Sequence, residues 1–166
     1  MLLKYAFHNS SQETSQAALR VLANSMLLKA ETRQMFVDQG YAPAACDALQ
    51  VHNWDNEFLI SRIIFLTTYG TSVKLPSLIK ENKLAEGINA TLGRHAELLQ
   101  KNTVTSVPPM EGMALTETLK LVFNITHYCK DLAGVFSPAI PHIITLLWRQ
   151  DIPEKDPLDP PFGPLV

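Results

Sequence analysis

Three six-residue stretches share one pattern: Leu-Arg-Val-Leu-Ala-Asn at 19–24, Ser-Arg-Ile-Ile-Phe-Leu at 61–66 and Leu-Lys-Leu-Val-Phe-Asn at 119–124. Their last residues stand at positions 24, 66 and 124, which are 42 and then 58 residues apart. A period of roughly 40 to 47 residues is typical of armadillo and HEAT repeats, and the longer interval fits once the loop 101–112 is inserted. The pattern therefore predicts an all-α fold, an armadillo/HEAT-like right-handed superhelical repeat (α-solenoid).

The rest of the chain is also helical in its periodicity, with no stretch of strict two-residue alternation. Ser10 and Glu13 have the spacing of a capping box, and Asn53 and Asp55 can cap a later, strongly apolar helix that ends near Gly70. In the first long helix the expected core stripe consists of Ala17, Ala18, Val21, Leu22, Ser25 and Leu28. The predicted helices span 12–29, 31–39, 43–51, 53–70, 75–80, 84–99, 113–129 and 140–150.

The chain divides into two parts. Residues 1–150 are expected to form about three to four armadillo-like units, because helical repeats bury their faces only against neighbouring repeats. Residues 151–166 hold five prolines, which cannot continue a helix, and read as a connection to a missing following repeat. An array that lacks polar end caps exposes apolar faces, so we also expect self-association through these ends.

Charge and composition exclude several classes of partner. Fourteen Lys and Arg stand against 16 Asp and Glu, for a formal charge of −2, which excludes a general basic field for nucleic acid. The uncharged run 132–148 contains Pro138 and Pro141 and falls short of a membrane span, so we expect a buried helix preceded by a turn. With no signal peptide and only two cysteines, a cytoplasmic protein with reduced thiols is expected.

The repeated stretches also align three cations. Arg20, Arg62 and Lys120 each lie one helical turn before the aligned positions 24, 66 and 124, so stacked helices would present a basic ladder. Amide, hydroxyl and aromatic side chains that suit a peptide or a helix flank this ladder: Gln16, Phe58, Tyr69, Thr116, His127 and Tyr128. The alternative interpretation is three solvated cations on ordinary amphipathic helices.

The sequence contains no glycine-rich phosphate loop, nucleophile elbow or paired-Cys metal motif, so neither enzyme chemistry nor a cofactor or metal is expected. His127 and Cys129 are two residues apart and point to different sides of a helix. His95 is expected on a helix surface or as a satisfied interior residue. Only a buried cluster with strongly perturbed protonation around His95 or His127 would favour an enzyme.

Four segments, 16–24, 31–42, 57–67 and 119–128, resemble in their combination and order synembryn, the resistance-to-inhibitors-of-cholinesterase family, particularly its fungal branch. The resemblance implies an armadillo-like superhelix that binds heterotrimeric G-protein α subunits, acts on them as a guanine nucleotide exchange factor without covalent chemistry, and assists their folding as a chaperone. It further implies that the concave surface holds the C-terminal helix of the α subunit, which loosens the nucleotide site.

The expected partner-binding residues are inferred from the alignment of the three stretches and not from a family motif. They are Arg20, Asn24, Phe58, Arg62, Lys120, Asn124 and His127. The second hypothesis is a general armadillo scaffold that binds another acidic or amphipathic peptide. Family members are several hundred residues long, so this chain looks like an internal piece of the superhelix. The partner would bring a cytoplasmic protein to the inner face of the plasma membrane.

Overall fold

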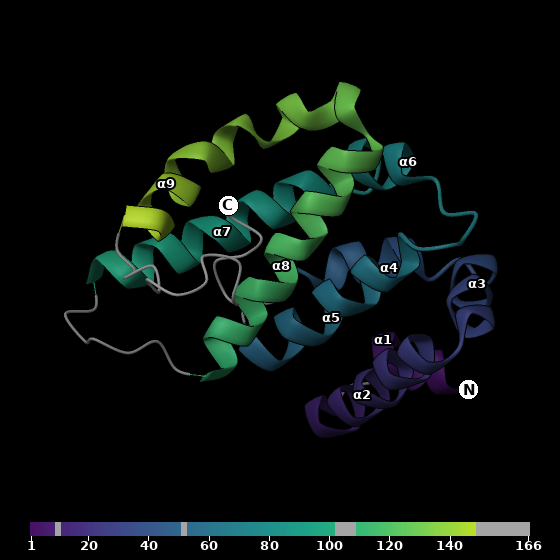
Figure 1. Cartoon of the computed structure of the whole chain (residues 1–166). Coiled ribbons are helices and arrows are strands. Elements are labelled where there is room, and N and C mark those ends of the chain that lie inside the picture. Colours follow the sequence, from purple (N-terminus) through teal and green to yellow (C-terminus); the bar gives the residue numbers. More distant parts are fainter. Residues whose placement is uncertain (9–10, 51–52, 102–108, 149–166) are drawn as a thin grey trace.

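The computed structural model describes residues 1–8, 11–50, 53–101 and 109–148, and every regular element in these ranges is a helix (Figure 1). The all-α prediction is therefore confirmed for the described residues. The elements are α1 (Leu2–His8), α2 (Gln12–Leu28), α3 (Ala30–Asp38), α4 (Ala42–Ala48), α5 (Trp54–Thr67), α6 (Leu75–Lys80), α7 (Leu84–Lys101), α8 (Pro109–Tyr128), the 3₁₀ helix η1 (Lys130–Ala139) and α9 (Ile140–Trp148). The predicted connection at 151–166 lies outside the described residues.

Local signals set most helix ends where the sequence predicts them. The Asn53 side chain accepts a hydrogen bond from the Asn56 backbone N at 3.1 Å and so caps α5. Gly40 and Gly70 follow α3 and α5 with φ values of 72° and 63°, a region that glycine adopts without steric cost. The cap of α2 is Ser11, whose hydroxyl accepts from the Thr14 backbone N; the predicted cap, Ser10, lies outside the described residues.

The start of α8 and the presence of α1 differ from expectation. α8 begins at Pro109, four residues before the predicted start, because proline at the first position lacks only an N–H that has no helical partner there. α1 is not predicted at all, since its seven residues are too few to show a period. Tertiary contacts hold it: Phe7 packs against Phe36 and Tyr41, with ring centroids 6.1 and 5.7 Å apart.

The three helices that carry the repeated stretches pack in a row, with α5 between α2 and α8. α5 and α8 run in the same direction, because Ser61 lies 3.0 Å from Thr118 and, further along both helices, Thr68 lies 2.6 Å from Asn124. Both helices bury large aliphatic side chains, among them Ile64 on α5 and Leu121 and Ile125 on α8. The three stretches thus lie on helices that are neighbours in space.

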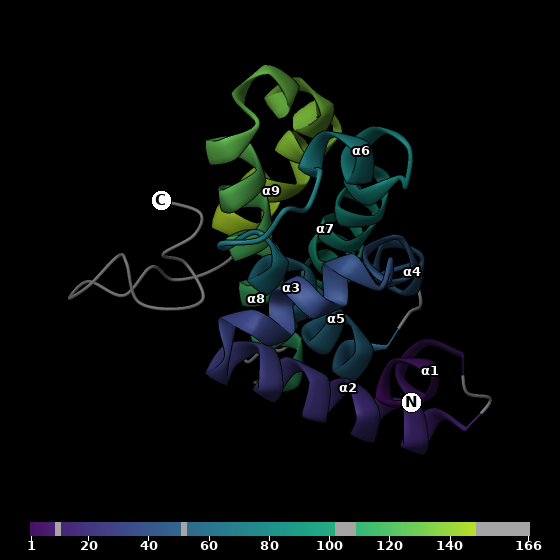
Figure 2. The ribbon, with the colours of Figure 1, turned by 90° about the vertical axis from the view of Figure 1, so that its right-hand side faces the viewer.

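The remaining helices cover this row. α7 packs against α4, α6 and α8, and η1 and α9 pack on α7 in turn. Figures 1 and 2 show α1 and α2 at one end of the molecule and η1 and α9 at the other. The molecule is therefore elongated along the direction in which successive helices stack.

The core face of α2 differs from the predicted stripe. Leu22 is buried as expected, but Val21 is 53% exposed and Leu28 is 81% exposed. The buried residues of α2 are Ala18, Leu19, Leu22, Ala23 and Met26. Apolar residues occur on more than one side of this helix, so the neighbours α1, α3 and α5 decide which side is buried.

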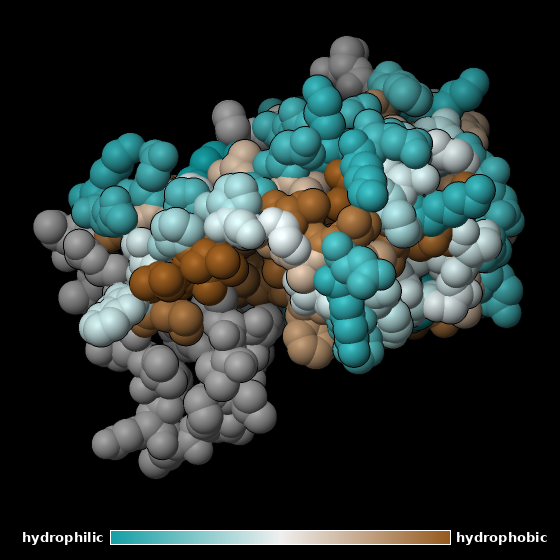
Figure 3. Space-filling model, turned by 90° about the horizontal axis from the view of Figure 1, so that it is seen from above, coloured by the Kyte–Doolittle hydropathy of each residue, from teal (hydrophilic) through white to brown (hydrophobic). Residues whose placement is uncertain are grey.

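The prediction of a buried helix after residue 132 is wrong. Leu146 is the only buried residue of α9, whereas Ile140, Ile144 and Trp148 are exposed along one face, and a 3₁₀ helix takes the place of the predicted turn. Figure 3 shows hydrophobic surface over α9, at its left. By length and composition alone, one helical segment among the described residues, Lys130–Trp148, could cross a membrane, and 17% of its apolar window is buried.

Candidate partner-binding groove

A groove of about 340 Å³ lies between α5 and α8, on the side away from the core. Its lining residues are Phe58, Arg62, Pro109, Gly112, Met113, Thr116, Glu117 and Lys120. The two α5 residues are four positions apart, and the α8 residues recur at intervals of three and four positions, so each set lies along one side of its helix. The parallel packing of the two helices brings the two faces together.

One carboxylate joins the two cations of the groove. Lys120 Nζ lies 3.2 Å from Oε1 of Glu117, and a terminal nitrogen of Arg62 lies 3.5 Å from the same oxygen. The guanidinium of Arg62 also covers the ring of Phe58, 5.0 Å from its centroid. Glu117 is buried, whereas about a third of each cationic side chain is exposed. The cations therefore keep donors directed toward solvent.

Arg20 does not join this pair. It lies 3.4 Å from Asp55 at the beginning of α5, and its side chain is exposed. Asp55 precedes Arg62 by seven residues, which is about 10 Å along a helix. The structure thus brings Phe58, Arg62 and Lys120 together and leaves Arg20 at the edge between α2 and α5.

The two asparagines of the shared register have different environments. Asn24 is exposed on α2. Asn124 is buried, donates to the Thr68 hydroxyl at 2.6 Å and lies 3.4 Å from the Tyr69 hydroxyl. The expectation that Asn124 contacts a partner is therefore corrected. Its amide group instead joins α8 to the end of α5. Asn24 and Asn124 differ because only Asn124 faces a neighbouring helix.

His127 is exposed at the C-terminal end of α8, about two turns beyond Lys120. Its ring stacks on Phe123 with centroids 6.2 Å apart and meets Tyr128 edge-on at 5.0 Å. Phe123 and Tyr128 are exposed as well. These three side chains form an aromatic surface that lies along α8 from the groove, and it includes one of the expected partner contacts.

Sequence reasoning missed Glu117. The available signal was its position three residues before Lys120, which places acid and base on the same face of a helix. No sequence pattern indicates the contact between Glu117 and Arg62. These two residues are 55 positions apart and meet only because α5 packs on α8.

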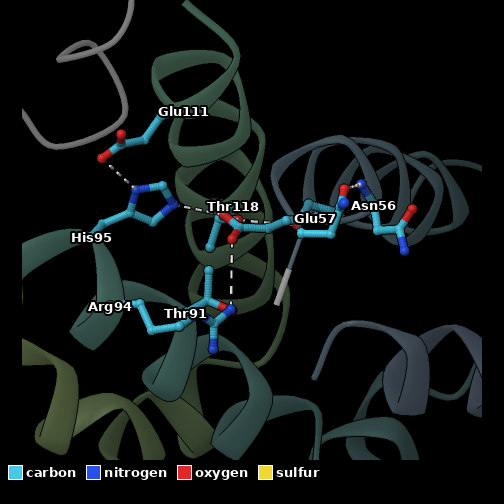
Figure 4. Close-up of polar contacts among 9 residues, drawn as sticks. Asn56, Glu57, Thr91, Arg94, His95, Glu111 and Thr118 are labelled. Atoms are coloured by element: carbon cyan, nitrogen blue, oxygen red, sulfur yellow. Dashed lines mark hydrogen bonds and ion pairs between the residues drawn. The ribbon is translucent and has the colours of Figure 1, made fainter. Parts of the chain in front are cut away.

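A buried polar cluster lies directly behind the groove, where α5, α7 and α8 meet (Figure 4). His95 Nε2 is 2.7 Å from Oε1 of Glu57, and His95 Nδ1 is 3.9 Å from Glu111. The hydroxyl of Thr118 donates to the same Glu57 oxygen at 3.4 Å, and Arg94 lies 3.6 Å from the other oxygen. Hydrogen bonds and ion pairs from two other helices thus hold the Glu57 carboxylate.

Of the two placements expected for His95, the interior one is confirmed: the residue is buried and its ring nitrogens have partners. The ring of Trp54 packs against it, with centroids 4.8 Å apart. The partners of His95 come from α5 and α8, and they join α7 to both of these helices. The described residues contain no group of three or more His, Cys, Asp or Glu side chains placed to hold a metal. Burial raises the pKa of the Cys46 thiol to about 12, which keeps it protonated and unreactive.

A small cationic groove on a row of parallel helices is the arrangement of a helical binding module. The model of one protein family, described as guanine nucleotide exchange factor synembryn (Ric8), matches residues 1–166. The chain belongs to this family, whose members act as exchange factors for G-protein α subunits. Neither the curated proteins nor the solved structures include a significant match to the chain.

Proposed function

We propose that this chain binds the C-terminal helix of a heterotrimeric G-protein α subunit in the groove between α5 and α8. The observation that carries the proposal is the pairing of Arg62 and Lys120 on one Glu117 oxygen beside Phe58. Two cations and one carboxylate leave one positive charge in a groove with apolar walls. An amphipathic helix that ends in a carboxylate has the complementary chemistry.

The proposal assigns different positions to the expected contacts. Phe58, Arg62 and Lys120 hold the end of the ligand helix, and His127 extends the surface along α8. Arg20 and Asn24 on α2 provide a polar margin on the other side of α5. Asn124 is left out as a direct contact, because it is buried between the helices.

Exchange activity and assistance in folding follow from the same contact. A protein that holds the C-terminal helix of the α subunit keeps it from packing on the GTPase core, which loosens the nucleotide site and shields an apolar segment during folding. This role needs no covalent step. The chain would act in the cytoplasm, at the inner face of the plasma membrane when its partner is there.

Titration calorimetry with a synthetic C-terminal peptide of an α subunit tests the proposal. The wild-type chain is expected to bind, and the double variant Arg62→Ala with Lys120→Ala is expected to lose at least about tenfold in affinity, since charge-assisted contacts are each worth more than 1 kcal/mol. A variant at the exposed Lys101, whose partner is Glu97 on α7, provides the control. Unchanged affinity of the double variant would refute the groove as the site.

A pull-down from cytosol separates this function from that of a general armadillo scaffold. Recovery of α subunits supports the exchange-factor role. Recovery of a different acidic or amphipathic protein without α subunits supports the scaffold. Nucleotide release from a purified α subunit, with and without the chain, then shows whether this chain suffices for exchange.

A further inference from the structure

The charge balance of the groove depends on one acidic residue. Of the eight residues that line it, three are charged: Arg62, Glu117 and Lys120. Glu117 is 5% exposed, whereas the Arg62 and Lys120 side chains are 32% and 37% exposed. The carboxylate thus forms the floor of the groove, and the cations stand between it and solvent.

The geometry leaves donors for a ligand. Both cations contact Oε1 of Glu117, at 3.2 and 3.5 Å. A guanidinium has five N–H donors and an ammonium has three, so one carboxylate oxygen uses only a small part of this capacity. An incoming anion can therefore bind the outer side of both cations without displacing Glu117.

The buried carboxylate limits how much negative charge can enter. A ligand anion on the outer side of the cations lies roughly 6 Å from Oε1 of Glu117, a distance at which like charges near a protein surface still repel appreciably. Water screens this repulsion poorly because Glu117 is buried. One negative charge on the ligand compensates the surplus positive charge of the groove. A second negative charge is repelled by the Glu117 carboxylate, and no further cation of the groove offsets this repulsion.

We propose that Glu117 is a specificity-determining residue that restricts the groove to a ligand segment with a single negative charge beside an apolar side chain. Phe58 and Met113 supply the apolar contact. The inference rests on the proposed function, because it names the kind of chain end that the α5–α8 groove accepts. Segments with two adjacent negative charges are excluded, because Glu117 leaves the two cations with only one surplus positive charge.

The first experiment uses the full chain and three peptides with the C-terminal sequence of an α subunit. One ends in the free carboxylate, one in an amide, and one carries an additional Asp at its last position. Wild type is expected to bind the first peptide best. In Glu117→Gln the Asp peptide is expected to gain about fivefold or more, while the amide peptide changes by less than about twofold.

Two further variants separate local charge from other effects. Glu97→Gln on α7 makes the same change in net charge away from the groove, and it is expected to leave all three affinities unchanged. The double variant Glu117→Gln with Lys120→Gln restores one surplus positive charge through Arg62 alone, and it is expected to return to the wild-type preference. A purely structural role for Glu117 predicts no such return, because the double variant has lost two contacts.

A second arm uses no α-subunit peptide. Acetate and sulfate are titrated at constant ionic strength while NMR follows the side-chain Nε–H of Arg62. Wild type is expected to prefer acetate, and Glu117→Gln to prefer sulfate. If the peptides fail to bind but the anion preference reverses, the proposed function is wrong and the role of Glu117 stands. If Glu117→Gln shows no gain for sulfate, the role of Glu117 is refuted whatever the peptides do.

Discussion

His95 Nε2 lies 2.7 Å from Oε1 of Glu57 in the interior of the protein, and this contact ties α7 to α5. Glu57 precedes Phe58 in the chain, and Thr118, which donates to the same carboxylate, follows Glu117. Adjacent residues of a helix point to different sides. The core cluster and the groove therefore lie on different sides of the same two helices, α5 and α8. The cluster thereby fixes the rotation of α5 and α8, and with it the meeting of Arg62 and Lys120.

The first prediction concerns this cluster. Glu57→Ala is expected to reduce the free energy of unfolding by about 3–5 kcal/mol, because it leaves His95 and Arg94 without their carboxylate in the interior. Urea unfolding followed by circular dichroism measures the loss. The exposed Glu97→Ala serves as the control, with an expected change of less than about 0.5 kcal/mol. Equal losses in the two variants would show that Glu57 does not hold the helices together.

The second prediction distinguishes the observed core face of α2 from the stripe that its sequence suggests. Leu22 is 3% exposed and Leu28 is 81% exposed. Leu22→Ala is expected to cost about 2–5 kcal/mol through the lost apolar contacts and the cavity that remains. Leu28→Ala is expected to change stability by less than about 0.5 kcal/mol. Thermal melts of the two variants at equal concentration give the comparison, and a large loss for Leu28→Ala would contradict the described packing.

The third prediction separates the three cations that the sequence aligns. Arg62→Ala is expected to weaken binding of the α-subunit peptide by about fivefold or more, since it removes a charge-assisted donor from the groove. Arg20→Ala is expected to weaken it by less than about twofold, because its exposed pair with Asp55 lies outside the groove. Calorimetry on the single variants decides this point. Equal effects of Arg20 and Arg62 would instead support one continuous ladder of three.

The fourth prediction concerns the two thiols. The pKa of Cys46 is raised to about 12 by burial, and that of Cys129 is raised by burial and by the charge of Asp131. Thiolate is the reactive form, so each cysteine reacts more slowly than a free thiol below its own pKa. Only Cys129 is partly exposed. At pH 8 a colorimetric disulfide reagent is expected to titrate one thiol in the folded chain and both after denaturation. Rapid reaction of both in the folded chain would be incompatible with a buried Cys46.

The fifth prediction concerns the apolar face of α9. Ile140, Ile144 and Trp148 are four residues apart and exposed along one side of the helix. We expect this face to mediate self-association of the chain, since water is expelled when two such faces meet. Ile144→Ser with Trp148→Ser is expected to lower the apparent mass in light scattering toward that of a monomer, and Val21→Ser, on the distant α2, is expected to leave it unchanged. A wild-type chain that is monomeric at all concentrations would remove this surface from consideration.

The helical pattern of the sequence has a physical reason. Stacked helices must each bury an apolar face against the next, so the same spacing of apolar residues returns once per unit. Caps such as Asn53 and terminators such as Gly40 act through bonds within a few residues, and these local signals were predicted correctly. The short α1 and the start of α8 at Pro109 were missed, because packing rather than a local period supports them.

The sequence by itself determined that the chain is helical, and it aligns Arg62 with Lys120 in two stretches that share one pattern. Only the tertiary structure decided that these two cations share Glu117, that Arg20 pairs with Asp55 instead, and that Asn124 is buried while Asn24 is exposed. Periodicity depends on neighbours three or four residues away, whereas the groove depends on side chains more than 50 residues apart. Their meeting is set by the rotation and offset of one helix on another.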